Sequence, residues 1–178
     1  PTVHDVTVYV GTNDGWVVAV DATEGTERWR ATTAESVLAS LAVADGTVYA
    51  ASTDGALYAL ATADGAQRWR TQLADGLNAE PAVAGDTVLV GDLEGGVTAL
   101  STADGSERWS FRTNGQVWTA PVVADGHIYV GTDEGVLYAL VGRSTDADTP
   151  SGSVSGAPMA QYDAAGSGYT TDETGPSR

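Results

Sequence analysis

Short apolar runs alternate with turn signals along the first 140 residues. In one well-formed unit, β-branched and aromatic residues gather in four runs, separated by turns that pair Gly with Asp, Asn or Glu; the runs span residues 106–113, 117–124, 127–132 and 136–141. Glycine accepts the positive φ that tight hairpin turns require, so such pairs between apolar runs predict hairpins. No stretch carries an apolar stripe of helical period. The pattern predicts four short antiparallel strands per unit.

The unit repeats every 40 residues, without an insertion. Columns of Trp, Arg, Gly and Ala keep this step: Trp29, Trp69 and Trp109; Arg28, Arg68 and Arg108; Gly25, Gly65 and Gly105; Gly15, Gly55, Gly95 and Gly135; Ala19, Ala59, Ala99 and Ala139. Four strands in a tandem repeat of this length are typical of a β-propeller blade. Kelch repeats are longer, about 50 residues, and WD-type blades carry Trp-Asp pairs that are missing here. We therefore predict an all-β propeller of four-stranded antiparallel blades.

Two linked motifs resemble a known family. The hairpin VGTNDGWVVAV at 10–20 returns at 50–60, 90–100 and 130–140, and AVDATEGTERW at 19–29 returns at 59–69 and 99–109. Together they resemble the PQQ-like repeat of eight-bladed quinoprotein-type propellers, in which Ala-x-Asp-x-x-Thr-Gly-x-x-x-Trp docks one blade on the next. The resemblance implies a blade-docking role for Ala19, Gly25, Trp29, Ala59, Gly65, Trp69, Ala99, Gly105 and Trp109. The motif's Asp is kept only as Asp21, and its Thr is replaced by Glu24, Asp64 and Asp104.

The repeat divides the chain into units at 1–30, 31–70, 71–110 and 111–141, or about 3.5 blades of an incomplete ring. The fourth unit ends without the docking motif. Residues 142–157 are rich in Gly, Ser, Thr and Asp and predict a flexible linker. The tail at 158–178 resembles the segment that opens many such propellers, which implies either that the chain is cut from a longer arrangement or that this tail completes an edge elsewhere in the ring. Because a part-ring exposes strand edges that invite pairing, we expect further blades, from a parent sequence or from a second copy.

Charge narrows the possible partners. The chain has 24 acidic residues against 8 basic ones, all Arg, for a net charge of −16. This charge repels phosphate backbones and anionic lipid, so we expect neither nucleic-acid nor membrane-surface binding. The absence of Lys resembles proteins of salt-loving archaea and predicts a haloarchaeal source with an acidic surface. At molar salt the Debye length falls to about 3 Å, so the carboxylates cease to repel one another.

Targeting and redox signals are few. No apolar run approaches the roughly 20 residues of a membrane helix. No charged and apolar leader precedes Pro1, so we expect a signal peptide to have been removed or left out. The chain has no Cys, which excludes disulfides, thiolate metal sites and cysteine nucleophiles.

Five Trp residues are the most conspicuous candidate contacts. The three in the repeated column could form a ligand platform, but their coupling to the Gly and Ala columns favours packing between blades. Trp16 and Trp118 lie outside the column, at a turn and at a strand start. Because propeller loops carry function, these two are the better candidates among the five for contacting a partner. Ordinary half-buried packing is the alternative reading.

Catalytic and metal-binding patterns are weak. The acidic turns Asn13-Asp14, Thr53-Asp54, Glu94 and Asp133-Glu134, and Asp146 with Asp148, lack the spacing of a calcium loop. His4 and His127 occupy variable columns, and no nucleophile elbow or His-rich metal spacing appears. We therefore predict no catalytic, cofactor-binding or metal-binding residue, with PQQ and calcium kept open as alternatives.

Two functions remain. The first is a non-catalytic PQQ-like propeller domain that binds or scaffolds proteins in the cell envelope, with a protein or further blades as partner and self-association as one form of it. The second is a fragment of a PQQ-dependent quinoprotein dehydrogenase. Such enzymes share the repeat, but many hold the quinone beside a vicinal-cysteine ring, with a calcium ion and a catalytic carboxylate. A remnant of a longer gene is a third reading.

Overall fold

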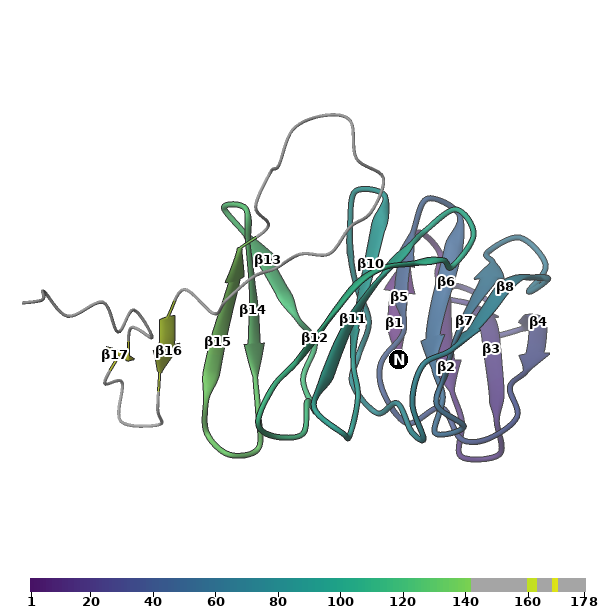
Figure 1. Cartoon of the computed structure of the whole chain (residues 1–178). Helices are drawn as coiled ribbons and strands as arrows, with labels where there is room; N and C mark the ends of the chain where they lie inside the picture. Colours follow the sequence, from purple (N-terminus) through teal and green to yellow (C-terminus); the bar gives the residue numbers. More distant parts are fainter. Residues whose placement is uncertain (142–159, 163–167, 170–178) are drawn as a thin grey trace, which may run out of the picture.

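The computed structural model describes residues 1–141, 160–162 and 168–169 and contains only strands and turns in them. Four antiparallel sheets follow one another along the chain (Figure 1). The first contains β1 (Thr2–His4), β2 (Thr7–Gly11), β3 (Trp16–Asp21) and β4 (Glu27–Thr32); the second, β5 (Ala42–Ala44), β6 (Thr47–Ala51), β7 (Ala56–Ala61) and β8 (Gln67–Gln72); the third, β9 (Ala82–Ala84), β10 (Thr87–Gly91), β11 (Gly96–Ser101) and β12 (Glu107–Arg112). The fourth contains β13 (Val122–Ala124), β14 (His127–Gly131), β15 (Leu137–Val141), β16 (Ala160–Tyr162) and β17 (Gly168–Tyr169). The predicted all-β architecture of antiparallel blades is confirmed.

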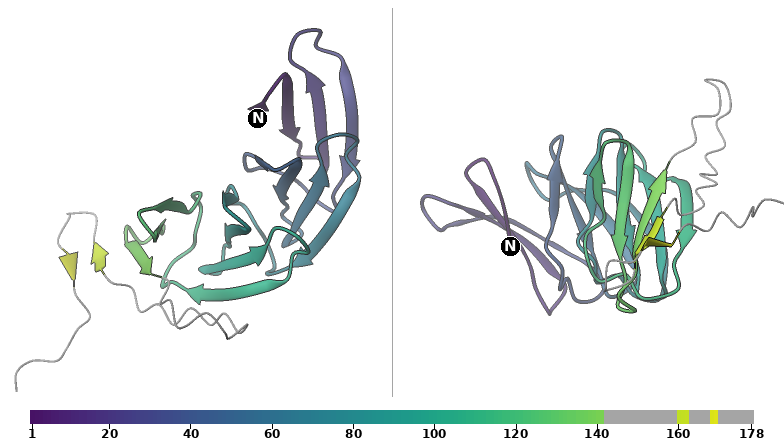
Figure 2. Two further views of the ribbon diagram at one scale, coloured as in Figure 1. Left: turned by 90° about the horizontal axis from the view of Figure 1, so that it is seen from above. Right: turned by 90° about the vertical axis from the view of Figure 1, so that its left-hand side faces the viewer.

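The blades stand side by side along an open arc (Figure 2). Their first strands line the concave side, where β5 contacts both β1 and β9, and β9 contacts β13. The last strand of each complete repeat, β4, β8 or β12, lies on the convex side. We call the contacts between consecutive blades the first, second and third junctions. The face that a blade turns to the next one is its forward face, and the opposite face is its backward face.

Turn chemistry sets the hairpins where the sequence predicts them. Asp45 and Gly46 join β5 to β6 with φ values of 47° and 70°. Two successive positive φ values match the type I′ turn, whose twist fits the twist of a hairpin. Each β3–β4-type pairing then contains a register shift, for example between Ala19 and Val20. The same shift recurs in the second and third blades.

The run predicted as a strand over 117–124 is wrong in its first half, since only Val122–Ala124 is a strand. Val117 instead crosses from the third blade to the fourth. Its N–H donates to the Asp92 carbonyl at 3.0 Å. Its side chain is fully buried against Gly91, where an added Cβ would lie 2.2 Å from Val117 Cγ1. Pro121 has no N–H for a ladder, so pairing starts only after it.

The fourth blade gains its outer strands from the tail. Ala160–Tyr162 pairs antiparallel with β15, in the place that β4, β8 and β12 hold elsewhere, and Gly168–Tyr169 adds a further strand. Sequence patterning stops the fourth repeat at Leu140 and did not predict this pairing. The predicted linker at 142–157 lies outside the described residues. Of the predicted tail at 158–178, only these two strands are described.

The hydrophobic core lies between blades, in one cluster per junction. At the first junction the forward face of blade one meets the backward face of blade two; the buried members include Tyr9, Val17, Trp29, Val48, Tyr58 and Leu60. The second and third junctions use the same columns. A sheet of short strands therefore buries its faces only against its neighbours.

The indoles of the repeated column fill the first two junctions. Trp29 and Trp69 are each only 8% exposed. Their Nε1–H groups donate to the carbonyls of Thr62 and Thr102 in the following blade, at 2.8 and 3.0 Å. Added Cβ atoms at Gly65 and Gly105 would lie 2.6 and 2.5 Å from the respective Trp Cε3 atoms. Both glycines have positive φ, so the space and the backbone exclude any side chain there.

The remaining predicted docking residues have unequal surroundings. Ala19, Ala59 and Ala99 are fully buried and pair across strands with Trp29, Trp69 and Trp109. An added Cβ at Gly25 would have nothing within 4 Å, because no described blade precedes the first. Trp109 is only partly buried. Thr62 and Thr102 supply the carbonyl acceptors for the first two indoles. The residue at the same repeat position for Trp109 is 142, which lies outside the described residues.

Replacing Trp69 by alanine is expected to destabilise the fold by about 3–5 kcal/mol, because it opens a cavity in the second junction and removes the bond to Thr102. Trp118→Ala is the matched control, since that indole is 48% exposed, and should change stability by under about 0.5 kcal/mol. Urea unfolding followed by far-UV circular dichroism measures both. Equal losses in the two variants would refute the packing role of Trp69.

Candidate interaction surface

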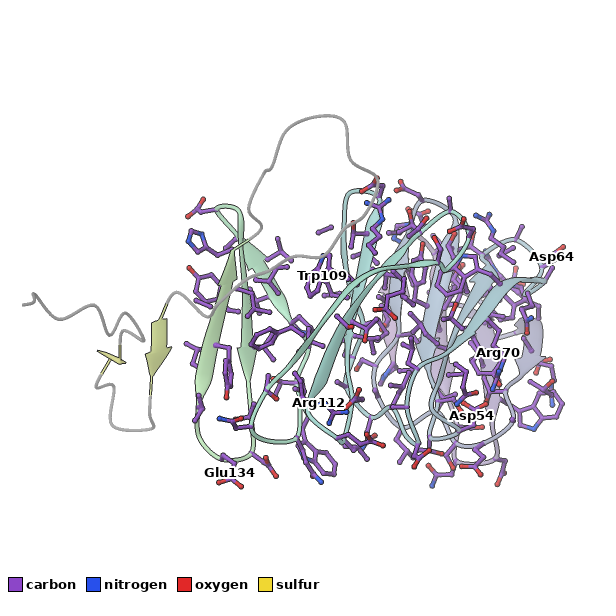
Figure 3. The ribbon with its side chains drawn as sticks, viewed as in Figure 1. Asp54, Asp64, Arg70, Trp109, Arg112 and Glu134 are labelled. Carbon is purple, nitrogen blue, oxygen red and sulfur yellow. The ribbon has the colours of Figure 1, made fainter. Side chains whose placement is uncertain are left out.

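One end of the arc carries the longest loops of the described blades. We call it the turn end; it consists of the turns at 12–15, 52–55, 92–95 and 132–135 and the crossing loops at 33–41, 73–81 and 113–121. Asp54, Arg112 and Glu134 lie towards this end in Figure 3, and Asp64 lies at the other. Because blade loops are free to vary on a fixed scaffold, this end is the natural place for a partner to bind.

Backbone hydrogen bonds hold the crossing loops in place. The amides of Val37, Leu77 and Val117 donate to the carbonyls of Thr12, Ser52 and Asp92, at 2.9, 3.1 and 3.0 Å. The following blade also contributes, since the Thr53 and Asp133 amides donate to the carbonyls of Ser36 and Gln116. Each loop is thus tied to the turns of both blades that it joins, and the turn end is a preformed surface.

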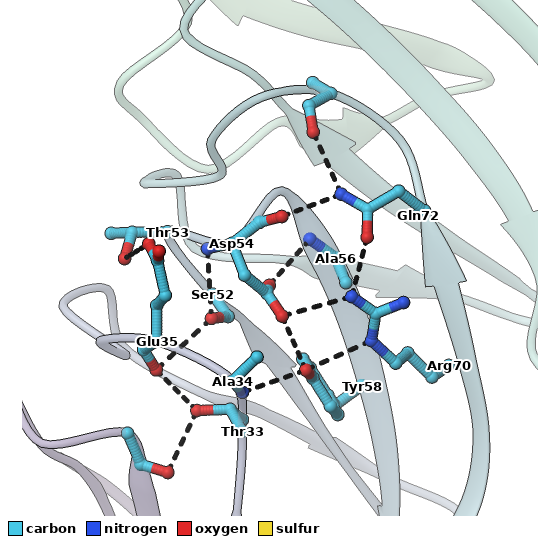
Figure 4. Close-up of polar contacts among 12 residues, drawn as sticks. Thr33, Ala34, Glu35, Ser52, Thr53, Asp54, Ala56, Tyr58, Arg70 and Gln72 are labelled. Carbon is cyan, nitrogen blue, oxygen red and sulfur yellow. Dashed lines mark hydrogen bonds and ion pairs between the residues drawn. The ribbon is translucent and has the colours of Figure 1, made fainter.

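Asp54 is the centre of a polar network in the second blade (Figure 4). Its side chain is 8% exposed. Its Oδ2 accepts hydrogen bonds from the Tyr58 hydroxyl at 2.6 Å and from Arg70 Nη2 at 3.1 Å, and its Oδ1 accepts one from the Ala56 amide at 2.9 Å. The Ala34 amide, on the preceding crossing loop, donates to the Tyr58 hydroxyl at 3.1 Å. The phenol therefore joins two blades.

Several carboxyl groups are held ionised by their surroundings. Burial alone would raise the pKa of Asp54, but its bonds from Tyr58, Ala56, Arg70 and Ser52 together lower it. Arg28, followed by the amides of Glu24 and Thr23, lowers the pKa of Asp21 to about 2. Sequence reasoning missed the Asp54 network. The available signal was Tyr at both 58 and 138, with an acidic residue four positions before each.

Trp16 and Trp118 lie on different blades. Trp16 starts β3 of the first blade, on its backward face, with the Arg30 guanidinium 5.5 Å from the ring centroid. Trp118 lies in the crossing loop before β13, 48% exposed, and its Nε1–H donates to Gln116 Oε1 at 3.0 Å. Trp118 belongs to the turn end and Trp16 directly follows its 12–15 turn, but no contact joins the two among the described residues. Trp118 is the large aromatic side chain that this surface offers to solvent.

The histidines and acidic turns offer little chemistry. His4 lies 3.6 Å from Asp5, and His127 packs on Tyr129 at 6.0 Å between ring centroids. In residues 1–141 and the two tail strands, no three His, Cys, Asp or Glu side chains gather as a metal site would require. Of the acidic turns weighed for calcium, Asp54 accepts a hydrogen bond from the Ala56 amide of its own turn, Asp133 accepts one from the Gln116 amide, and Glu94 pairs with Arg112.

Comparison with known proteins now identifies the repeats. The family described as outer membrane protein assembly factor BamB matches residues 1–76 and 57–149. The chain belongs to this BamB family. The recognition of a PQQ-like repeat protein is thereby confirmed. No curated protein matches the chain.

Solved structures agree with a propeller. BamB from Moraxella catarrhalis is 28% identical with a TM-score of 0.68, over 75% of this chain and 42% of that one. This BamB-family chain thus spans less than half the length of that relative. The designed protein Ika4 is 19% identical with a TM-score of 0.69, over 78% of this chain and 87% of that one. The predicted β-propeller class is confirmed.

Enzymes share the fold. Quinohemoprotein alcohol dehydrogenase from Pseudomonas putida HK5 has a TM-score of 0.75 at 17% identity, over 92% of this chain and 33% of that one. At that identity the likeness shows the fold alone. The described residues lack a cluster of metal ligands, and the whole chain lacks the cysteines of a vicinal-cysteine ring. The described residues therefore offer no donor set for a quinone held with calcium.

No helix that could cross a membrane occurs in the part of this BamB-family chain that the structure describes.

Acid should weaken the fold through the carboxyl groups whose pKa is lowered. A depressed folded-state pKa adds stability above the unfolded value of about 3.9, and this stability is lost as the pH falls through the folded value. For Asp21 that loss extends to about pH 2. We expect Asp54→Asn to lower the free energy of unfolding at pH 7 by about 1–3 kcal/mol, and by less at pH 3.

Asp14→Asn is the matched control for Asp54→Asn, because Asp14 is the exposed residue of the same column in the first blade. Its unfolding free energy at pH 7 should stay close to that of the wild type. Urea titrations at the two pH values give the comparison. An Asp54→Asn loss that is the same at pH 3 and pH 7 would contradict an ionised Asp54 in the network.

Proposed function

We propose that this chain is a non-catalytic, protein-binding scaffold of the BamB family that works in the cell envelope. The observation that carries the proposal is the family match, combined with blades whose conspicuous side chains are used to hold neighbouring blades together. A preformed turn end with an exposed indole supports a binding role, because Trp is among the residues that dominate binding energy at interfaces. The relative's name, assembly factor, is consistent with a polypeptide as ligand.

The binding surface of this proposal is the turn end around Trp118. Its loops are held by backbone bonds, so little ordering cost arises on binding. The chain's net charge of −16 favours partners with a basic segment. The other end of the blades carries shorter turns, among them the two-residue turn Asp45-Gly46.

Selection of a displayed random-peptide library on the immobilised chain supplies a probe for the turn end. Trp118→Ala should weaken the selected peptide at least tenfold in fluorescence anisotropy, since loss of an interface anchor costs about 2 kcal/mol or more. Val6→Ala is the control, because Val6 is 54% exposed at the opposite end. Failure to select any peptide, or equal effects of the two substitutions, would refute the proposal.

The open faces of the first and fourth blades give the scaffold a second mode of contact. Val8, Val18 and Val20 lie on the outward face of the first blade. The residues at the same repeat positions in the second blade, Val48, Tyr58 and Leu60, are buried in the first junction. The fourth blade turns outward Leu137, 40% exposed, in the column of the buried Leu57. These two faces are complementary by repetition, so a second copy, arranged head to tail, continues the existing junctions.

Two head-to-tail copies close into a ring, because the same contact then forms twice around one axis. In molar salt, where the carboxylates are screened, sedimentation velocity should give a dimer of the 178-residue chain. Leu137→Arg should yield a monomer, since it places a charge in the junction. Leu38→Arg is the control, at an exposed loop position off both faces. A wild-type chain that sediments as a monomer would refute this mode of contact.

A further inference from the structure

A cleft opens at the second junction, near the turn end. Its volume is about 340 Å³, and its lining includes Gln72, Leu73, Asp92, Thr98, Ser110 and Arg112. Gln72 and Leu73 come from the second blade, and the other four come from the third. At the first and third junctions the equivalent space is filled by a side chain of the repeat itself.

A tyrosine of the repeat fills the equivalent space at the other two junctions. Tyr58 at the first and Tyr138 at the third are each 4% exposed. The hydroxyl oxygen of each accepts a hydrogen bond from the preceding crossing loop: from the Ala34 amide at 3.1 Å and from the Asn114 amide at 3.0 Å. At the second junction the same column holds Thr98. The cleft is thus a junction without its phenol.

A second exchange in the same place enlarges the space. Arg70 of the second blade lies with its guanidinium carbon 5.3 Å from the Tyr58 ring centroid, and its Nε–H donates to the Tyr58 hydroxyl at 3.1 Å. Its counterpart in the third blade is Ser110, whose hydroxyl is turned to Glu107 at 2.8 Å. Both large groups of the first junction are therefore replaced by small ones at the second.

Hydrogen-bonding groups remain at the vacated place. The Ala74 amide, counterpart of Ala34 and Asn114, donates at 3.3 Å to the Gly55 carbonyl, which already accepts the Leu73 amide at 2.9 Å. This is a weaker arrangement than the bonds to tyrosine hydroxyls at the other junctions. Ala74 directly follows Leu73, which lines the cleft, so a phenol entering it would lie close to a donor at the repeat position that the fold uses elsewhere for tyrosine.

Asp92 supplies the acceptor. It is 8% exposed, and its Oδ1 accepts hydrogen bonds from the amides of Glu94 and Gly96 at 2.8 and 2.7 Å. An added Cβ at residue 96 would lie 2.1 Å from Oδ2, so the glycine makes room for the carboxylate. Among the described residues Oδ2 accepts no hydrogen bond. Side-chain atoms sealed from solvent all have partners, so Oδ2 is not sealed, and Asp92 lines the cleft.

We propose that this cleft binds a tyrosine side chain presented by a protein partner, in the place of the phenol that the repeat lacks there. The ligand hydroxyl donates to Asp92 Oδ2, as the Tyr58 hydroxyl donates to Asp54 Oδ2 at 2.6 Å, and Leu73 covers the ring. The carboxylate rejects phosphotyrosine by charge. As a binding mode for a polypeptide, this proposal rests on the proposed function, but the site can be tested without any partner.

The test uses N-acetyltyrosinamide, N-acetylphenylalaninamide and p-cresol, titrated into the whole chain and followed by ¹H–¹⁵N NMR. We expect the tyrosine amide to bind with a dissociation constant on the order of millimolar, as suits so small a ligand, and to shift the Ala74 amide resonance. The phenylalanine amide should bind about tenfold or more weakly, because a buried carboxylate loses its donor. Equal binding of the two amides would overturn the proposal.

Variants separate the site from the fold. Thr98→Tyr restores the column from within, so binding of the tyrosine amide should be lost while the thermal midpoint stays the same or rises. Thr98→Val keeps the side-chain size and should retain binding. Asp92→Asn should reduce the preference for tyrosine over phenylalanine. Thr98→Tyr protein that remains folded and binds like the wild type would refute the site.

Other outcomes identify the source of the ligand. If p-cresol binds and the tyrosine amide does not, the cleft takes free phenols and the partner assignment is wrong. If N-acetylargininamide binds more tightly than the tyrosine amide, the acidic lining selects cations and the phenol assignment is wrong. Binding of the tyrosine amide together with failure of the peptide selection at Trp118 would leave the cleft standing and remove the proposed function of the turn end.

Discussion

The fit of one indole against one glycine in the next blade is the contact on which the rest of the structure depends. A sheet of four short strands has two apolar faces and no layer of its own to cover them. Trp29 and Trp69 cover one face each, and their N–H groups find carbonyls that would otherwise lose hydrogen bonds in the junction. The residue that faces the indole in the next blade must be glycine, because there is no room for a Cβ and the φ is positive. The docking is therefore specific to one position, and it also buries apolar surface.

Once the indoles fix the junctions, other columns are free to differ. The Tyr58 column adds a second, polar tie between blades, through a buried carboxylate and a crossing-loop amide. Its replacement by Thr98 costs one such tie without breaking the second junction, because Trp69 still spans it. Repeat proteins distribute stability over neighbouring interfaces, so a single junction can carry an exposed acceptor and a cleft while the arc persists.

The period and the turn signals made the architecture predictable from the sequence. Trp, Gly and Ala columns can keep one step over four units only if each unit has the same neighbours, and Asp45-Gly46 demands a tight hairpin. The crossing loop around Val117 was harder to predict from the sequence, because its β-branched and aromatic residues have the pattern of a strand, although they join two blades. The pairing of β16 with β15 was not predictable in detail, because the tail does not repeat the docking motif that marks the last strand of the other blades.

The candidate sites were predictable in the same uneven way. Trp118 stands out because it lies outside the indole column, at a repeat position that holds Leu38 and Asn78 in the earlier units. In the sequence the cleft is marked only by Thr98 and Ser110, where the second blade has a tyrosine and an arginine. The effect of these small residues can be recognised only once the structure shows that the tyrosine and the arginine contact each other. In a propeller, the positions at which one repeat differs in sequence from the others are thus the ones that indicate binding sites. The departures that leave a polar group open to a cleft without a partner in the chain, as at Asp92 Oδ2, are the ones that favour a ligand, since a ligand can supply the donor that the repeat supplies elsewhere.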